Sequence, residues 1–167
     1  MILFTIPFFY VFNYSQSIDL SNNKVVYDLP YPGILPDHPL YFLKAIRDKL
    51  QDFFTRDNIK KAQLYLLYSD KRLAMTLALE KKGEDALAFS TLSKGEKYFL
   101  KIPDLLRQSK EQGTSPSAEL VGEIKLSNQK HEEVIRQMLQ ELPQGNQESI
   151  NQTLKMTDSI HQQLQSF

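Results

Sequence analysis

The sequence predicts an all-α protein, an antiparallel up-down helical bundle of about five helices preceded by an extended, proline-rich strap. Apolar residues recur at helical spacing through nearly all of the chain after Asp37. The segments with this period are separated by short breaks that contain Gly, Pro or capping residues. With 167 residues, of which 41% are hydrophobic, the chain can bury a sizeable core.

The N-terminal segment, residues 1–17, reads as a signal peptide or a truncated membrane anchor. Its first 12 residues, MILFTIPFFYVF, are an apolar run, and small residues lead to a possible cleavage site after Ser17. No Lys or Arg precedes the run, and it is too short to cross a bilayer core of about 30 Å as a helix. A first core helix or strand is the alternative. We expect an extracytoplasmic protein, secreted or anchored in the envelope.

The strap occupies residues 18–36 and holds most of the prolines that precede the helices. Proline fixes φ and favours an extended residue before it, so neither a helix nor a central strand is expected here. The apolar residues between the prolines indicate that the strap lies against the bundle of its own chain. A docking peptide for a partner is the alternative.

The helical core is expected over residues 37–111 as three helices. Asp37 should cap the first, which ends near Thr55, and Asp57 the second, which ends at Gly83. The third starts at Glu84 and should break at Pro103. The first helix is expected to bury the stripe Leu40, Leu43, Ile46, Leu50, Phe53 and Phe54. The wide apolar face of the second helix predicts a central position.

A glutamine-rich hairpin of two more helices is expected over residues 112–167. Ser115 should cap the fourth helix, and Asn146 the fifth. Short connections predict that consecutive helices lie antiparallel. Within the third helix, Gly95 stands in the apolar stripe, which indicates a close approach between two helices.

The segment PGILPDHPLYFLK over residues 32–44 and the stretch SDKRLA over residues 69–74 are similar to a family pattern. They resemble an uncharacterised bacterial domain of unknown function, found in candidate-phylum bacteria and related to one in actinobacterial exported proteins. The resemblance covers Val25 to Leu100. It implies a helical domain with an N-terminal signal or membrane segment, and it implies no activity for any residue.

Composition and motifs exclude several classes of function. A protein with a net charge of zero lacks the excess of basic residues that is typical of a nucleic-acid binder. The absence of cysteine excludes thiolate chemistry. We find no nucleophile elbow, phosphate loop or dinucleotide fingerprint, so no catalytic residue and no cofactor is predicted. The sequence HEE at 131–133 fails as a zinc-protease helix because position 135 is Ile.

Seven residues are singled out for an interaction or structural role: Tyr31, Asp37, His38, Tyr41, Arg47, Asp70 and Arg72. His131 lies on an apolar stripe and is expected to be a hydrogen-bonded core histidine. His38 beside Asp37 could make a weak metal site, although capping explains Asp37 without a metal.

Asp70 falls on the apolar side of the second helix, between Leu66 and Leu73. A carboxylate buried there needs a partner, for which we expect Arg47 or Lys97. Arg72 lies on a different face, together with Tyr65 and Tyr68, and is expected to stack on them. Five tyrosines could line a sugar- or peptide-binding groove or hold the strap to the first two helices: Tyr27, Tyr31, Tyr41, Tyr65 and Tyr68.

Together these observations predict a non-enzymatic helical domain with a structural or protein-interaction role outside the cytoplasm. Its partner would be a protein or an envelope component, and contact with the membrane is expected only through the N-terminal segment. A membrane-tethered or cytosolic adaptor that binds a partner helix is the first alternative. An enzyme that uses dispersed carboxylates is the second.

Overall fold

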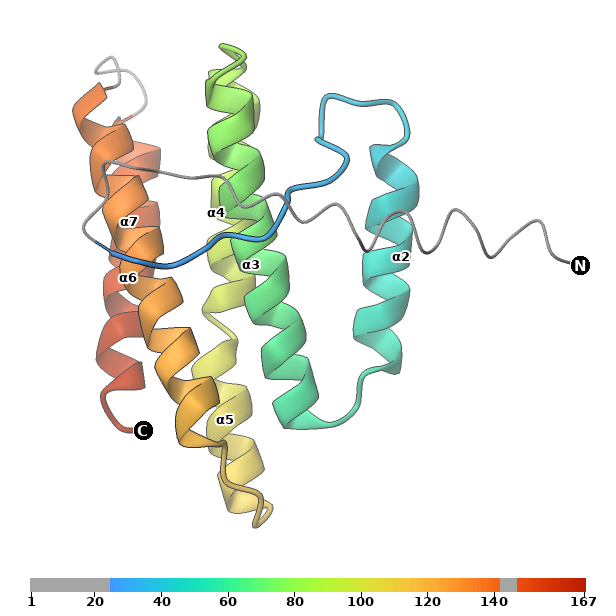
Figure 1. Ribbon diagram of the computed structural model, residues 1–167, viewed down its shortest axis with the longest axis vertical. Coiled ribbons are helices and arrows are strands. Elements are labelled where there is room, and N and C mark those ends of the chain that lie inside the picture. The colour runs from blue at the N-terminus through green and yellow to red at the C-terminus, as the bar shows by residue number, and fades with distance from the viewer. Residues whose placement is uncertain (1–24, 142–146) are drawn as a thin grey trace, which may run out of the picture.

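The computed structural model describes residues 25–141 and 147–167, and within these ranges the chain is all-α with no strand (Figure 1). Its helices are α2 (Tyr41–Phe54), α3 (Asn58–Glu80), α4 (Asp85–Phe99), α5 (Ile102–Glu111), α6 (Ala118–Glu141) and α7 (Gln147–Leu164). The predicted fold class is confirmed. The expected signal segment and the Asn146 cap lie outside the described residues. None of the helices in the described ranges is long and apolar enough to cross a membrane.

The helices alternate in direction along the long axis of the molecule (Figure 1). The helices α4 and α5 make one pass, because Pro103 starts a new helix without a change of direction. The described residues therefore make five passes, as the sequence predicted. The predicted central position of the second helix is also confirmed, since α3 contacts α4, α5 and α6, and α7 closes the bundle against α4 and α6.

Two predicted helix boundaries are confirmed. The carboxylate of Asp57 accepts a hydrogen bond of 2.8 Å from the backbone N–H of Lys60, which caps α3. Gly83 has a φ of +75°, the left-handed conformation that ends a helix without a Cβ penalty.

Two other predicted caps are wrong. The first helix starts at Tyr41, three residues later than expected, and Asp37 instead pairs with the Lys82 ammonium at 2.7 Å. Pro39 explains the delay, because it biases its predecessor towards extended conformations. The helix α6 is capped by Ser117, whose hydroxyl accepts from the Leu120 N–H, and not by Ser115.

The apolar core consists of two clusters stacked along the bundle. One joins α3 to the end of α4 and to α5, α6 and α7, and the other joins α3 to α4, α6, α7 and the strap. The fully buried side chains at their centres include Phe99, Ile102, Leu106 and Ile124 in the first cluster, and Leu73, Leu92, Ile135 and Ile150 in the second. The C-terminal hairpin is thus part of the same core as α3, α4 and α5.

Gly95 lies where α3 and α4 approach closely, as its place in the stripe predicted. A Cβ at this position would come within 3.1 Å of the Arg72 Cβ and 3.4 Å of the Ser69 carbonyl oxygen. A Cβ placed on Gly122 in α6 would meet no neighbouring atom within 4 Å. The two helical glycines therefore differ in the space that surrounds them.

We expect the substitution Gly95→Leu to lower the free energy of unfolding by about 1–3 kcal/mol, because it forces α3 and α4 apart. The matched substitution Gly122→Leu should leave stability unchanged or raise it, since leucine is a better helix former than glycine. Urea denaturation of both variants measures the difference. Equal effects of the two substitutions would contradict the close approach at Gly95.

The apolar stripe of α2 is the main departure from the sequence prediction. Its side chains were expected in the core, but they are exposed to solvent: Leu40, Leu43, Ile46, Leu50, Phe53 and Phe54. Helical period shows that one face is apolar, and it does not show whether that face points inward. In Figure 1, α2 stands at the edge of the molecule beside α3.

The strap lies across the bundle from α6 to the start of α2 (Figure 1). At its first described residue, the Val25 N–H donates to Glu133 at 3.0 Å and the Val25 carbonyl accepts from Lys130 at 3.2 Å. Leu29 is buried with an exposed fraction of 2% and belongs to the second core cluster. For residues 25–36, the described part of the strap, the prediction that it lies on its own bundle is confirmed.

Candidate functional site

A network of buried polar side chains crosses the centre of the bundle and begins at Asp70 on α3. The Asp70 carboxylate accepts hydrogen bonds of 2.6 Å from the hydroxyl of Tyr27 on the strap and 2.6 Å from that of Ser127 on α6. Its burial and its need for partners are as predicted. The predicted partners are wrong, because Arg47 pairs with Asp48 at 2.7 Å on the outer helix α2, and Lys97 lies on the exposed side of α4.

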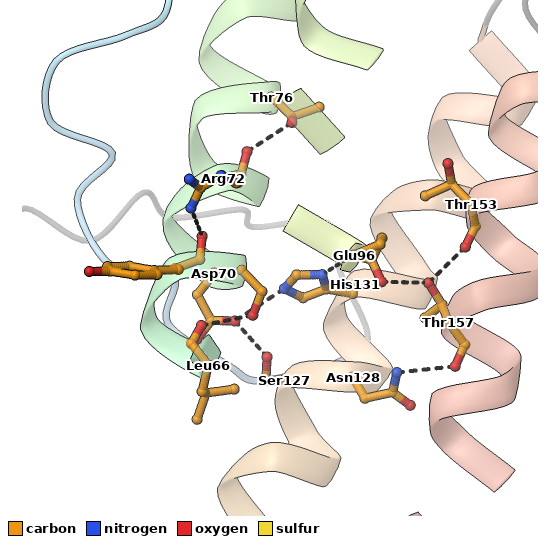
Figure 2. Close-up of polar contacts among 12 residues, drawn as sticks. Leu66, Asp70, Arg72, Thr76, Glu96, Ser127, Asn128, His131, Thr153 and Thr157 are labelled. Atoms are coloured by element: carbon orange, nitrogen blue, oxygen red, sulfur yellow. Dashed lines mark hydrogen bonds and ion pairs between the residues drawn. The ribbon is translucent and has the colours of Figure 1, made fainter. Parts of the chain in front are cut away.

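His131 on α6 lies between two carboxylates (Figure 2). Its Nε2 is 3.1 Å from Asp70 Oδ1, and its Nδ1 is 2.5 Å from Glu96 Oε1 on α4. The Phe99 ring meets the imidazole edge-on at 5.1 Å. This confirms the prediction of a hydrogen-bonded core histidine, and it shows that both ring nitrogens are engaged.

The two carboxylates favour the imidazolium form of His131. Burial by itself lowers the pKa of His131, but the nearby charge of Glu96 and the hydrogen bonds that the ring donates to Asp70 and Glu96 outweigh it and raise the pKa to about 9. A protonated imidazole donates from both nitrogens, which fits its two carboxylate neighbours. The bundle therefore holds a buried cation between two anions near neutral pH.

Glu96 carries the network on to α7. Its second carboxylate oxygen accepts a hydrogen bond of 2.8 Å from Thr157, whose backbone carbonyl in turn accepts from the Asn128 amide at 3.2 Å (Figure 2). The sequence prediction missed Glu96 and Thr157. Each lies on the apolar stripe of its helix, Glu96 between Leu92 and Phe99, and that placement was the available signal.

The network is sealed from solvent. The side chains of His131 and Glu96 are 0% exposed and that of Asp70 is 4% exposed. A general acid or base must come within hydrogen-bonding reach of its substrate, directly or through one water. In this conformation the network can hold five elements together, and it cannot reach a molecule outside. Within the described ranges, no three His, Asp or Glu residues are arranged to hold a metal ion.

Arg72 and its aromatic neighbours form a second, shallower cluster. The guanidinium lies 4.5 Å from the ring centre of Tyr98 and 5.7 Å from that of Tyr68, and it donates to the Tyr68 carbonyl. The predicted stacking is confirmed for Tyr68, but the second ring that the Arg72 guanidinium contacts is that of Tyr98, which the sequence prediction missed, and not that of Tyr65. Cation–π contacts of this kind contribute about 0.5–1 kcal/mol at exposed sites.

The remaining predicted residues lie apart from the network. Tyr31 is exposed on the strap, and Tyr41 is half-buried, which raises its pKa. The His38 ring accepts from the Leu40 N–H at 3.1 Å and is exposed. Asp37 and His38 thus each have a local partner. Of the seven residues singled out, only Asp70 joins the buried network.

The family model of a domain of unknown function, DUF5667, matches residues 33–145, more than half of the chain. The chain belongs to this family. The match extends well past Leu100, where the resemblance in the sequence was expected to end, and includes all of α6. The search of curated proteins found no match to the chain, and neither did the search of solved structures.

The DUF5667 segment contains the charged centre of the network but not its edges. Asp70, Glu96 and His131 all lie within residues 33–145, whereas Tyr27 and Thr157 lie on either side of that range. In this member of the family, the strap and α7 therefore supply hydroxyl donors from outside the matched domain.

We expect the substitution Tyr27→Phe to lower the free energy of unfolding by about 1–3 kcal/mol, because Asp70 loses a hydrogen-bond donor in a buried site. It should also speed amide exchange at Leu29, where the strap enters the core. The control is Tyr31→Phe, since Tyr31 is exposed and lies outside the network. Equal exchange at Leu29 in both variants would contradict a role for Tyr27 in holding the strap.

Proposed function

We propose that this protein is a non-enzymatic helical domain that works outside the cytoplasm, in an envelope-associated structural or interaction role. The observation that carries the proposal is the sealed network. The only histidine in the described core has both nitrogens engaged by carboxylates and is 0% exposed. The hydrogen bonds of the network around it join the strap, α3, α4, α6 and α7, which fits a rigid scaffold.

Export is supported by the sequence of residues 1–17, with its apolar run and small residues before Ser17. The test is the mature N-terminus of the full chain, expressed with a C-terminal tag in its native host and determined by mass spectrometry. We expect cleavage near Ser17 and recovery in the extracytoplasmic fraction. The control, Phe8→Asp, interrupts the apolar run and should block both. An intact Met1 in the cytoplasm would overturn the proposed location.

The non-enzymatic role has a separate test. The triple variant Asp70→Asn, Glu96→Gln, His131→Gln keeps hydrogen-bonding groups of similar size and removes acid–base chemistry from the network. If this variant folds, we expect it to replace the natural protein in a deletion strain. A folded variant that fails to return the deletion strain to the wild-type phenotype would indicate that the network performs chemistry.

A further inference from the structure

The outer face of α2 is apolar along its whole length. Phe53 and Phe54 are exposed to 67% and 73%, and the other side chains of the face are about half exposed: Phe42, Leu43, Ile46 and Leu50. Together they form a continuous stripe, which we call the α2 face. A contiguous, aromatic-rich apolar surface on a protein marks a site of interaction.

The opposite side of α2 is polar and holds the helix to the bundle. Asp48 is buried with an exposed fraction of 5%, and its backbone carbonyl accepts from the Tyr68 hydroxyl at 3.0 Å. The Lys44 ammonium donates to the Pro32 carbonyl of the strap at 3.2 Å. These polar attachments orient the helix, so that the α2 face points away from the core.

A cavity lined by cations lies at the C-terminal end of the α2 face. It has a volume of about 720 Å³, and Phe53 lines it together with Arg56, Lys61 and Lys101. Asp104, an acidic residue of the same lining, pairs with Arg107 at 2.8 Å. The exposed apolar stripe thus continues into a site of net positive charge.

Basic side chains also flank the α2 face along its length. By helical period, Lys49 lies along one edge and Arg47 along the other, and both are exposed. The two acidic residues of the helix point towards the bundle, where Asp48 pairs with Arg47 and Asp52 with Lys61. An apolar face edged by cations is the arrangement found in helices that lie in a membrane interface.

The size of the α2 face argues against a second copy as its occupant. The α2 face has six apolar side chains on one helix of 14 residues, which spans about 21 Å. A stable interface takes about 20–30 residues from each partner. A bilayer surface sets no such minimum, because it receives apolar side chains and cations independently.

We propose that the α2 face and its cation-lined cavity bind the surface of an anionic lipid bilayer. The helix lies in the interface with Phe53 and Phe54 among the acyl chains. Arg56 and Lys101 then lie at the level of the lipid phosphates. This deepens the proposed function by naming the partner, and it departs from the expectation that only the N-terminal segment meets a membrane.

The experiment uses a local fluorescent reporter, because the apolar run of residues 1–12 could bind vesicles in every variant. The chain contains no tryptophan, so Phe53→Trp in the full-length protein places a single indole on the α2 face. The matched control is Leu126→Trp, an exposed position on α6. Vesicles contain phosphatidylcholine, alone or mixed equally with phosphatidylglycerol, and brominated phosphatidylcholine serves as the quencher.

We expect the emission of Phe53→Trp to shift to the blue and to be quenched by brominated lipid in the anionic vesicles, while Leu126→Trp stays unchanged. Adding Arg56→Gln and Lys101→Gln to Phe53→Trp should weaken the response to anionic vesicles at least tenfold, because each removes a cation near the phosphates. Circular dichroism checks that all variants keep their helices.

Three results would overturn the proposal. The first is vesicle binding without any shift of Phe53→Trp, and the second is an equal shift in vesicles of phosphatidylcholine alone. The third is a shift that appears without lipid as protein concentration rises, which would assign the α2 face to a second copy. Cleavage at Ser17 tests export separately, so either proposal can fail alone.

Discussion

Replacing His131 with Gln is expected to lower the free energy of unfolding by about 3–5 kcal/mol, the usual cost of removing one partner from a buried ion network. The substitution leaves the carboxylates of Asp70 and Glu96 in the core without the cation that lies between them. Because whole domains are stable by only about 5–15 kcal/mol, this is the largest single effect that we expect from one side chain.

Denaturation with guanidinium chloride near neutral pH measures this loss for His131→Gln. The control is His161→Gln, since His161 lies on α7 and contacts only the exposed Gln165 among the described polar groups. That substitution should change stability by less than about 0.5 kcal/mol. A loss in His131→Gln no greater than in the control would show that the imidazole does not neutralise the two carboxylates.

The stability of the protein is expected to fall as the pH rises from about 6.5 to about 9. The pKa of His131 is 6.5 in its ordinary state and about 9 in the folded protein. Between these values the folded state holds a proton that the unfolded state has lost, so the free energy of unfolding decreases with rising pH. The full contribution, about 3 kcal/mol, is present below the lower value and is gone above the upper one.

Thermal unfolding followed by circular dichroism across this pH range measures the decline. The variant His131→Gln provides the control, because it has no imidazole at this position and should show a much flatter profile. A natural protein whose melting temperature stays constant through this range would contradict a charged His131, and so would a variant with the same slope.

Helical period predicted which residues share a face, and this was enough to predict the helical bundle. The stripes of the second to fifth helices identified buried residues such as Leu73, Leu92 and Ile135. The same helical period also placed Asp70 and His131 inside the core. Period describes each helix by itself, so it could not show that Asp70 and His131 meet across two helices. The partner of Asp70 was therefore predicted wrongly.

The α2 face could not be predicted for a related reason. A helix with one apolar side usually buries it, and the sequence of α2 has such a side. Its outward direction depends on polar contacts made from the other side, among them the bond from Tyr68 to the Asp48 carbonyl. That hydrogen bond joins residues 20 positions apart, and no local sequence pattern predicts it.

The order of the network residues along the chain has a consequence during synthesis. Asp70 and Glu96 leave the ribosome before His131, which lies 61 and 35 residues later. Until α6 follows, the α3–α4 hairpin brings two carboxylates towards one another with no cation between them. We therefore expect the nascent hairpin to stay loosely closed, and compaction to await the emergence of α6.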